Sequence, residues 1–592
     1  MSDSELPASV LAADIGSTLT HVALFARVEG VYRFVARAEA PTTLREPECD
    51  VTLGLRRAIK RLEEIAGRRL LNDQEEPLTP EAEPNAGVDA FVATSNAAPA
   101  LQCVIVGLTD DLSVESAKNA CAAANVWVAQ TISLGKRMRQ WDDRSLEQMR
   151  RTPPDIILLV GGMDTGPVAP LQGAARVLTT IFEGLAREKR PVIVFAGNQE
   201  ARRPVAQLMS PDFEVRVVDN VRPNVHLESL GELQRELAEI YERIKLASLP
   251  GYRRLRRWCQ VPILSSMEAL SIVWRFMARR HEPPQSILGV DVGGATTYVG
   301  AARGELYQWV VGANLGTSFG CARVSELSPL GHVLRWLPVA MPADEAVHRL
   351  ENIHLRPHSI PQTMEDLLLV QAIARQALLL TMRRMRHQFW SRPEIKPEEE
   401  TNLPFDLIAA RGGALVHTPQ DGVIALTLLD ALQPVGLAWL VLDWASIWPQ
   451  LGALALVAPL AAGQVLERDG LRPLGTVLAP RGDAREGERA LRIKIVYPDG
   501  HTVEDDIPAG VVQRFPLPPD AVAQIEVWPR RDWDIGLGRQ GQGGKAEVRG
   551  GDLGIIVDTR GRPLALPQDA EYRRRKLQQW LGDLLDHGHR PV

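Results

Sequence analysis

The 592-residue sequence predicts an α/β fold of two related lobes, with a Rossmann-like domain inserted in the first lobe and a β-rich domain at the end. Three observations predict it. A hairpin pattern of an acid followed by glycine occurs twice, short apolar strands alternate with helical segments between about residues 101 and 224, and short strands separated by Pro, Gly and Asp follow residue 474. A chain of this length should hold several domains, since single cores stop growing near ~250–300 residues.

The composition excludes several classes of protein. Hydrophobic residues make up 45% and charged residues 24% of the chain, as in soluble globular proteins. A net charge of −6 leaves no basic footprint for a nucleic acid. Five scattered cysteines without CxxC spacing argue against a disulfide scaffold or a zinc site and fit a reducing cytoplasm. The acidic N-terminus does not have the pattern of a signal peptide.

The most apolar stretch of the chain runs from Gly436 to Gly463. It is interrupted by Asp443, Pro449 and Gln450, whereas a membrane helix needs ~20 uninterrupted apolar residues. The stretch therefore predicts a buried core helix, and no membrane partner is expected.

The first hairpin opens the chain. Residues 10–22 predict a strand that ends on Asp14, a turn containing Gly16, and a second strand. A further strand is expected over 32–38 and a helix over 50–65. The helix has one apolar face, formed by Val51, Leu55, Ala58, Ile59 and Leu62.

Residues 91–98 predict a strand and a polar turn in which Thr94 and Ser95 either touch a ligand or simply turn the chain. Beyond them strands and helices alternate, which implies right-handed crossovers and a parallel sheet. The expected strands are Cys103–Val106, Val126–Val128, Ile156–Val160, Val192–Phe195 and Val215–Val218. Three of them end in polar or glycine turns, so a second ligand or partner site and plain strand-exit turns are equally good interpretations. No GxGxxG follows a strand, so a dinucleotide is not indicated.

The second hairpin, residues 287–299, has the layout of the first. Five pairs fall in frame: Asp14 with Asp291, Gly16 with Gly293, Ser17 with Gly294, Thr20 with Thr297, and Val22 with Val299. Glycines in the turn let a ligand approach the main chain, and an acid at the strand end suits a metal-bound phosphate. Either hairpin alone is explained as an ordinary turn, whereas two in frame favour two lobes that offer phosphate hairpins to a shared cleft.

The chain after the second hairpin carries a third motif. A glycine-rich loop over 312–320 either forms a pocket wall or caps a helix, and a loop over 352–361 precedes a long helix over 364–389. The basic face of that helix is expected to be solvated: Arg375, Arg383, Arg384 and Arg386. Residues 405–415 then predict a strand, a glycine pair and a helix start.

The two hairpins together resemble the phosphate-1 and phosphate-2 motifs of the actin, heat-shock chaperone and sugar-kinase ATPase superfamily. Residues 291–297, Asp-Val-Gly-Gly-Ala-Thr-Thr, are similar to the Asp-Ile-Gly-Gly-Ala-Thr-Thr signature of the glutamate mutase L family, and the resemblance covers roughly residues 8–470. It implies two actin-like ATPase lobes of the ribonuclease H-like class. The glycine pair at 412–413 resembles the superfamily's adenosine motif, where Arg411, in place of a small residue, would either cover the adenine by stacking or block it.

The resemblance implies a site for ATP and Mg²⁺ between the lobes. Asp14 and Asp291 would be the catalytic acids and would hold the magnesium through water, and the turn amides would bind the phosphates. The nucleotide-binding residues would be Gly16, Ser17, Thr18, Gly293, Gly294, Thr296, Thr297, Gly412 and Gly413.

The resemblance also implies a function. The protein would be an ATP-binding, slowly hydrolysing accessory protein that activates or restores an adenosylcobalamin-dependent mutase of the glutamate (methylaspartate) mutase type, with the mutase subunits as its client. The family signature usually continues with Asp where this chain has Tyr298, and loss of hydrolysis would favour a non-hydrolysing nucleotide-binding scaffold. His21, at the matching place in the first hairpin, is expected to be a strand-facing residue rather than a base. A small-molecule kinase of the same fold ranks last, because no motif indicates an acceptor.

The expected domains follow the order of these motifs. They are a first actin-like ATPase lobe over 1–100, the inserted Rossmann-like domain over 101–226, the hinge and second lobe over 227–470, a β-rich domain over 471–570, and a C-terminal helix and tail over 571–592. Helices are expected over 227–244 and 268–279, and the hinge is expected between them, near 245–265. No chemistry is assigned beyond residue 470.

Overall fold

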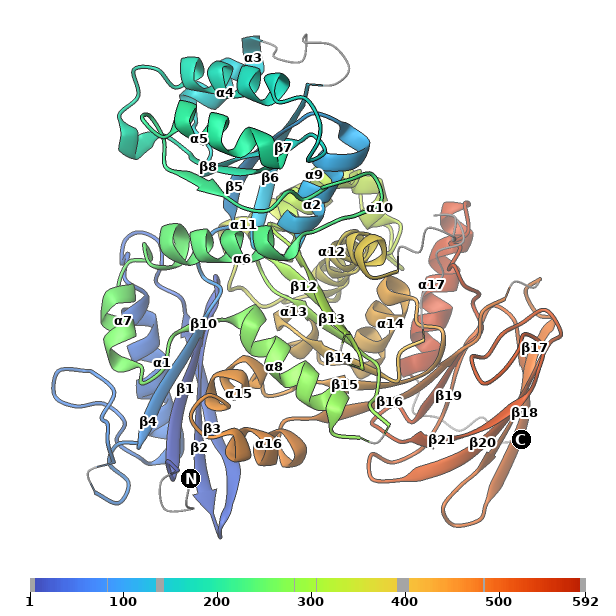
Figure 1. The fold of residues 1–592 in the computed structure, drawn as a ribbon. Helices are drawn as coiled ribbons and strands as arrows, with labels where there is room; N and C mark the ends of the chain where they lie inside the picture. Colours follow the sequence, from blue (N-terminus) through green and yellow to red (C-terminus); the bar gives the residue numbers. More distant parts are fainter. Residues whose placement is uncertain are drawn as a thin grey trace. The chain divides into compact units, whose positions relative to one another are not determined.

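The computed structural model describes residues 6–81, 83–134, 143–281, 283–304, 306–390, 404–482 and 485–585 (Figure 1). The chain forms two compact units. The first comprises residues 1–97 and 250–592, and the second is Ala98–Leu249.

The first lobe of the first unit is built on a five-stranded sheet. Its strands are β1 (Ser9–Ile15), β2 (Leu19–Val28), β3 (Val31–Pro41), β4 (Ala90–Ser95) and β10 (Leu264–Ser265), in the order β10-β4-β1-β2-β3. β1 pairs antiparallel with β2 and parallel with β4. The central strand β1 is buried along its whole length, as its unbroken apolar run up to Asp14 predicts.

The second lobe repeats this topology. The strands β11 (Ile287–Val292), β12 (Thr297–Arg303), β13 (Leu306–Gly312), β14 (Leu407–Arg411) and β15 (Gly436–Leu442) are ordered β13-β12-β11-β14-β15. Their directions match those of the first lobe, with β11 antiparallel to β12 and parallel to β14. In both hairpins the acid faces the residue seven positions later: Asp14 pairs with His21, and Asp291 with Tyr298. The predicted two-lobe α/β fold with an internal repeat is confirmed.

Helix α1 (Val51–Ala66) covers one face of the first-lobe sheet, on β2 and β3. Asp50 caps its first turn by accepting the Thr52 amide, and Gly67 ends it in the left-handed region at φ 62°. The five residues of its predicted apolar face are all buried. The helical spacing of apolar residues thus predicted both the helix and the face of it that packs on the core.

Helix α8 (Ser266–Arg279) connects the lobes and contacts strands of both. Ser265 and Glu268 form a capping box at its start. Trp274 lies on Gly289 and Gly300, which face each other across β11 and β12; a Cβ on either glycine would come within 2.3 Å or 2.7 Å of the indole. The two glycines therefore make the flat surface on which α8 packs.

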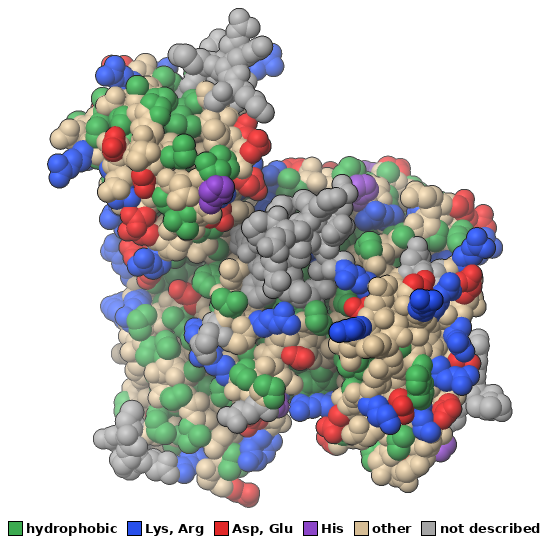
Figure 2. Space-filling view, turned by 45° about the vertical axis from the view of Figure 1, so that its right-hand side comes forward, with side chains coloured by type: hydrophobic (Ala, Val, Ile, Leu, Met, Phe, Trp, Pro, Cys, Tyr) green, Lys and Arg blue, Asp and Glu red, His purple; other side chains and the backbone are tan. Residues whose placement is uncertain are grey.

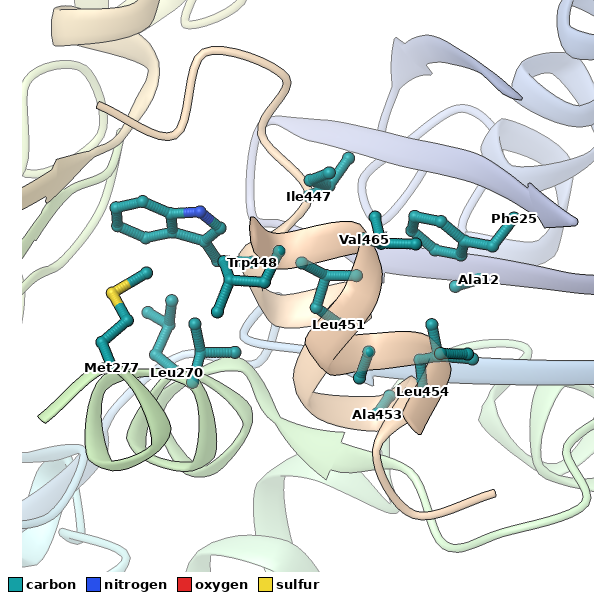
Figure 3. Packing of buried hydrophobic residues seen from close by; sticks show 14 of the residues in the cluster. Ala12, Phe25, Leu270, Met277, Ile447, Trp448, Leu451, Ala453, Leu454 and Val465 are labelled. Atoms are coloured by element: carbon teal, nitrogen blue, oxygen red, sulfur yellow. The ribbon is translucent and has the colours of Figure 1, made fainter. Parts of the chain in front are cut away.

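Helix α15 (Trp448–Leu454) follows the second-lobe strand β15 but packs on β1 and β4 of the first lobe and on α8. Figure 3 shows Trp448 pointing toward Leu270 and Met277 of α8. Helix α16 (Pro459–Arg468) packs on β3, whose Tyr32 amide donates to Gln464 Oε1 at 2.9 Å. The lobes thus share one apolar core.

The expectation of one buried helix over 436–463 is wrong, although the stretch is deeply buried. It contains strand β15, helix α15 and the start of α16. An apolar run without periodicity does not distinguish a buried strand from a buried helix. Within the described ranges, every helix is too short or too polar to cross a bilayer.

The region after residue 470 is β-rich, and three of its strands continue the second-lobe sheet. β16 (Arg472–Ala479) pairs with β15, and β22 (Ile555–Asp558) and β19 (Val512–Phe515) complete eight strands. A separate sheet has the order β18-β17-β20-β21, from β17 (Arg489–Val496), β18 (Thr502–Pro508), β20 (Val522–Pro529) and β21 (Gly544–Arg549). The terminal helix α17 (Ala570–Leu585) packs on α14 (Asp421–Leu432) and β19.

The second unit is a five-stranded, all-parallel sheet, as predicted. Its order is β6-β5-β7-β8-β9, from β5 (Leu101–Gly107), β6 (Val126–Ser133), β7 (Ile156–Gly161), β8 (Val192–Gly197) and β9 (Val215–Val217). Helix α6 (Gly231–Tyr241) packs on α2 (Glu115–Ala122), so this unit extends past the expected boundary at residue 226.

Polar residues after three of these strands bind one another. Asn220 Nδ2 donates to Gly162 O and to Asp164 Oδ1, each at 2.9 Å, and Asn198 Nδ2 donates to Gly166 O at 2.8 Å. Their hydrogen-bonding groups are therefore used inside the turns. This favours strand-exit turns over a second ligand site.

The long helix α12 (Met364–Trp390) agrees with the sequence, and Arg383 and Arg384 of its basic face are exposed as expected, but Arg375 is not. Arg375 is 4% exposed, and its Nε donates to Asp430 Oδ2 at 2.8 Å. The expectation of a solvated Arg375 is wrong because α12 is packed on several sides.

Residues 352–355, expected in a loop, are the last turn of α11 (Ala343–Leu355). On the face in Figure 2, basic and acidic side chains are interspersed.

Candidate functional site

Both hairpin turns open into one cavity of about 600 Å³ in the first unit. Ten of the predicted site residues line it: Asp14, Gly16, Ser17, Thr18, Asp291, Gly293, Gly294, Thr296, Gly412 and Gly413. Thr297 does not. It is fully buried, and its Oγ1 donates to Leu315 O at 2.7 Å. Thr297 was wrongly assigned because successive side chains of a strand point to opposite sides, so only its neighbour Thr296 faces the cavity.

Each of the two turns is closed by an equivalent backbone hydrogen bond. Gly16 N donates to Leu19 O and Gly293 N to Thr296 O, both at 3.0 Å. These two amides are used within the turns, so their expected role as phosphate donors is wrong. For the amides of Ser17 and Gly294, no acceptor is found in the described part of the chain. Those two remain for an anionic ligand.

Gly294 and Gly412 have no room for a side chain. A Cβ on Gly294 would lie 2.4 Å from Ser318 Oγ and 2.5 Å from Thr18 Oγ1, so the two hairpin tips approach each other there. Gly412 has a φ of +111°, and its Cβ would lie 2.3 Å from Val292 O. At Gly412 glycine is required for the close approach of two backbones, whereas at Gly294 the neighbouring atoms are the side-chain hydroxyls of Ser318 and Thr18.

The loop after β13 forms one wall of the cavity. Thr317 N donates to Gly293 O at 3.1 Å and Ser318 N to Gly294 O at 2.9 Å. Both residues line the cavity. The loop therefore fixes the second hairpin, which agrees with the pocket-wall interpretation of 312–320.

Two buried side-chain oxygens at the cavity lack hydrogen-bond partners among the described residues. They are Thr18 Oγ1 and Asn96 Oδ1. Buried polar atoms are normally hydrogen-bonded, because leaving one unpaired costs ~1–3 kcal/mol. These atoms are therefore available to a polar ligand.

Asp14 is held by two hydroxyl groups. Its Oδ1 accepts from Thr94 Oγ1 and from Ser266 Oγ, both at 2.7 Å. Thr94 is the residue of β4 in register with Asp14, and Ser266 is the first residue of α8. Thr94 thus orients the acid, a role that neither sequence interpretation of it included.

Arg411 is the unexpected member of the site. It stands in register with Asp291, and its Nη1 donates to Asp291 Oδ2 at 3.0 Å. Its Nη2 lies 3.5 Å from Asp14 Oδ2, and its Nε donates to Asp443 Oδ2 at 3.2 Å. The guanidinium is held by three acids instead of extending over the glycine pair. The expectation that Arg411 covers or blocks an adenine is therefore wrong.

The charges of this cluster depend on one another. Burial raises the pKa of Asp291 and of Asp443, and the charge of Arg411 opposes the rise in both. Burial alone would lower the pKa of Arg411, but Asp291, Asp14 and Asp443 together raise it above its usual value. The guanidinium accordingly stays protonated.

The residues present do not fit a magnesium ion shared by Asp14 and Asp291. The position between the two carboxylates is taken by the Arg411 guanidinium. Mg²⁺ requires about six oxygen ligands at ~2.0–2.1 Å. Among the described residues, no group of three or more His, Cys, Asp or Glu side chains is arranged to hold a metal ion.

His21, Glu39 and His417 form a second polar group on the cavity wall. His21 Nδ1 lies 3.2 Å from Glu39 Oε2. A hydrogen bond from His21 lowers the pKa of Glu39 to about 2, and burial lowers the pKa of His417. His21 is a strand residue, as expected, but its side chain contributes to the site.

Another part of the cavity wall comes from α11, the loop expected before the long helix, and the start of that helix. Arg349 and Asn352 of α11, residues 356–362 and Asp366 of α12 all line the cavity. Arg349 Nε donates to Glu345 Oε1 at 2.9 Å, and its Nη1 pairs with Asp366, which ties α11 to α12. The segment has no motif of its own, and only tertiary packing brings it to the hairpins.

Comparison with known proteins gives a family match over most of the chain. A family model described as "MutL protein" matches residues 10–470. "Protein MutL" of Clostridium tetanomorphum is 24% identical over 439 residues, which cover 70% of this chain and 87% of that protein. The matched range agrees with the resemblance found in the sequence, which ended near residue 470.

Solved structures show only distant likeness. A nucleotide-free acetone carboxylase shares 12% identity at a TM-score of 0.32 and covers 85% of this chain and 81% of its own. Gluconate kinase from Lactobacillus acidophilus shares 11% sequence identity at a TM-score of 0.29, and the match covers 79% of this chain and 93% of the kinase. A nucleotide-free diol dehydratase-reactivating factor shares 12% sequence identity at a TM-score of 0.28, and the match covers 77% of this chain and 100% of that factor. TM-scores this low carry no conclusion about function.

Proposed function

The chain belongs to the MutL protein family, and from that premise we propose that it is an ATP-binding accessory protein for an adenosylcobalamin-dependent mutase of the glutamate (methylaspartate) mutase type. The mutase subunits would be its client, and its role would be to activate or restore that enzyme in the cytoplasm. The observation that carries the nucleotide part of this proposal is the single cavity onto which both hairpin turns open.

The free polar groups of the cavity give the proposed binding mode. The amides of Ser17 and Gly294 and the hydroxyl of Thr18 would donate to the phosphates, where the two hairpin tips come together. Gly412 and Gly413 would let the adenosine lie against the backbone. Closure of the lobes around ATP would be the signal passed to the client.

Magnesium has no part in this binding mode through Asp14 and Asp291, because Arg411 occupies their shared position. The catalytic role expected for the two acids remains a prediction. A non-hydrolysing nucleotide-binding scaffold is the second candidate function. Two observations favour it: the guanidinium between the acids, and the buried Tyr298 where the family signature has a carboxylate opposite Asp291.

The first test is ATP binding by the purified full chain, measured by calorimetry beside Thr18→Ala. Thr18 Oγ1 has no protein partner among the described residues, so its removal should not lower the melting temperature. Loss of one hydrogen bond should weaken ATP binding about threefold to tenfold. Thr180→Ala, at an exposed position of helix α4 (Ala169–Ile181) in the second unit, is the matched control and should bind as the wild type does. Absence of ATP binding by the wild type would refute the proposal.

The client is tested separately. The chain is added with ATP to mutase subunits whose bound cobalamin has been inactivated, and mutase activity is followed. Recovery that requires ATP turnover would support the accessory role. Stable complex formation with ATP but without turnover would instead favour the scaffold, and no interaction would remove this client.

A further inference from the structure

We propose that Arg411 is a built-in counter-cation at the phosphate site, so that this chain binds nucleotide without needing a divalent cation. The inference rests on the proposed nucleotide function and specifies how the same cavity is neutralised. In a site of two facing carboxylates, a polyphosphate is repelled unless a cation lies between the acids. Here the chain supplies that cation itself.

The contacts of Arg411 place it between the acids and not merely near them. Each nitrogen of its guanidinium faces a different carboxylate: Nη1 faces Asp291, Nη2 faces Asp14 and Nε faces Asp443. The side chain is only 6% exposed, and the three acids are 5%, 5% and 0% exposed. A guanidinium held from three sides at this burial cannot be exchanged for solvent without opening the cluster.

The oxygens of the cluster are almost all used. Asp14 Oδ1 accepts from Thr94 and Ser266, and Asp443 accepts the amides of Ile447 and Trp448 at 2.9 and 3.0 Å. With the three contacts of Arg411, five of the six carboxylate oxygens have protein partners. Only Asp291 Oδ1 has none among the described residues, which is too few ligands for Mg²⁺.

In the internal repeat, Arg411 holds the position that a neutral residue, Thr94, holds in the first lobe. Asp14 is in register with Thr94 on β4, and Asp291 is in register with Arg411 on β14. The two lobes therefore use equivalent positions differently: a hydroxyl orients one acid, and a cation pairs with both acids. The added charge lies at the acid pair and has no counterpart in the first lobe.

The test compares nucleotide affinity in Mg²⁺ and in excess EDTA, using calorimetry on the full chain. The wild type should bind ATP with equal affinity within about threefold under the two conditions. Arg411→Ala should bind at least about tenfold more tightly with Mg²⁺ than with EDTA, because the acids then need an external cation. Arg411→Lys, which keeps a charge, should remain closer to the wild type.

A second readout uses Mg²⁺ alone, without nucleotide. Removing Arg411 frees three clustered carboxylates, so Mg²⁺ should raise the melting temperature of Arg411→Ala by about 5 °C and leave the wild type unchanged. Arg375→Ala is the matched control: it removes an equally buried arginine from an ion pair with Asp430, away from the cavity. It should be destabilised without any response to Mg²⁺.

The outcomes separate this inference from the proposed function. A wild type that binds ATP only with Mg²⁺ would overturn the inference and leave nucleotide binding intact. A wild type that binds no ATP in either buffer would refute the proposed function, and the inference with it. If Arg411→Ala does not fold, the ATP affinities of the wild type and of Arg411→Lys in Mg²⁺ and in EDTA still test the inference.

Discussion

Glu39 is a residue of the cavity wall whose ionisation depends on pH through its contact with His21. The hydrogen bond from His21 lowers its pKa to about 2 from an ordinary value of 4.5. A carboxyl whose folded-state pKa is lowered stabilises the fold above its unfolded pKa, and this stabilisation is lost as pH falls toward the folded pKa. The relevant window is therefore between about pH 4.5 and pH 2.

Glu39→Gln should remove this dependence. The melting temperature of the wild type should exceed that of the variant at about pH 6, and the difference should shrink toward about pH 3. Differential scanning fluorimetry across that range measures it. A difference that stays constant with pH would show that the pair does not stabilise the fold through the Glu39 charge.

Single residues were predicted unevenly, for physical reasons. Asp14 and Asp291 were found because the repeat fixes their frame, and both line the cavity. The contacts of Arg411 could not be read from its own strand, because they depend on which strands lie beside it. Aligning 90–95 with 407–411 would have placed Arg411 at the Thr94 position, next to Asp291, and this signal was present in the sequence.

At the scale of elements, a buried ion network joins α12, α14 and the segment after β22. Asp430 of α14 accepts from Arg375 Nε at 2.8 Å and from Arg560 Nη1 at 2.7 Å, and Arg560 also pairs with Asp558. All four side chains are buried. Because a buried charge without its partner is costly, the network makes the C-terminal region part of the second lobe's stability.

Asp430→Asn should destabilise the chain by about 3–5 kcal/mol, since two buried guanidinium groups lose their shared partner. Asp421→Asn on the same helix is the control. Its partner Arg472 is 40% exposed, so its loss should cost about 0–1 kcal/mol. Urea unfolding monitored by circular dichroism measures both. Equal effects of the two variants would contradict the structural role of the network.

Elements with a clear period were predicted well, and elements buried on all sides were not. α1 has one apolar face, and its limits and buried residues agree with the sequence. The stretch from β15 to α16 is apolar throughout, so its pattern indicated burial but not conformation. α15 packs on the sheet of the first lobe through contacts between residues far apart in the sequence, and no local sequence pattern predicts such contacts.

For the whole molecule, the match to the MutL family ends at residue 470, but the second-lobe sheet does not. β16 pairs along the full length of β15, and β22 continues from it. A chain ending at Gly470 would leave the β15 edge unpaired, and such edges promote aggregation.

We therefore expect a chain truncated after Gly470 to aggregate on expression, whereas the full chain is monodisperse. Size-exclusion chromatography with light scattering measures this. A monodisperse, folded truncation would mean that the strands after residue 470 are dispensable for the lobe. The duplicated lobes were predictable from two short motifs. The continuation of the sheet was not, because pairing between strands as far apart as Thr476 and Ile555, 79 positions along the chain, leaves no local pattern.

The packing of α15 on β1 and β4 also bears on how the chain is made. The strands that need this cover leave the ribosome early, whereas residues 448–454 follow some 350 residues later. At ~5–20 residues per second, translation leaves that apolar face uncovered for roughly 20–70 s. During that interval the nascent first lobe is a ready substrate for holding chaperones, and its folding is completed only when the far end of the second lobe has been synthesised.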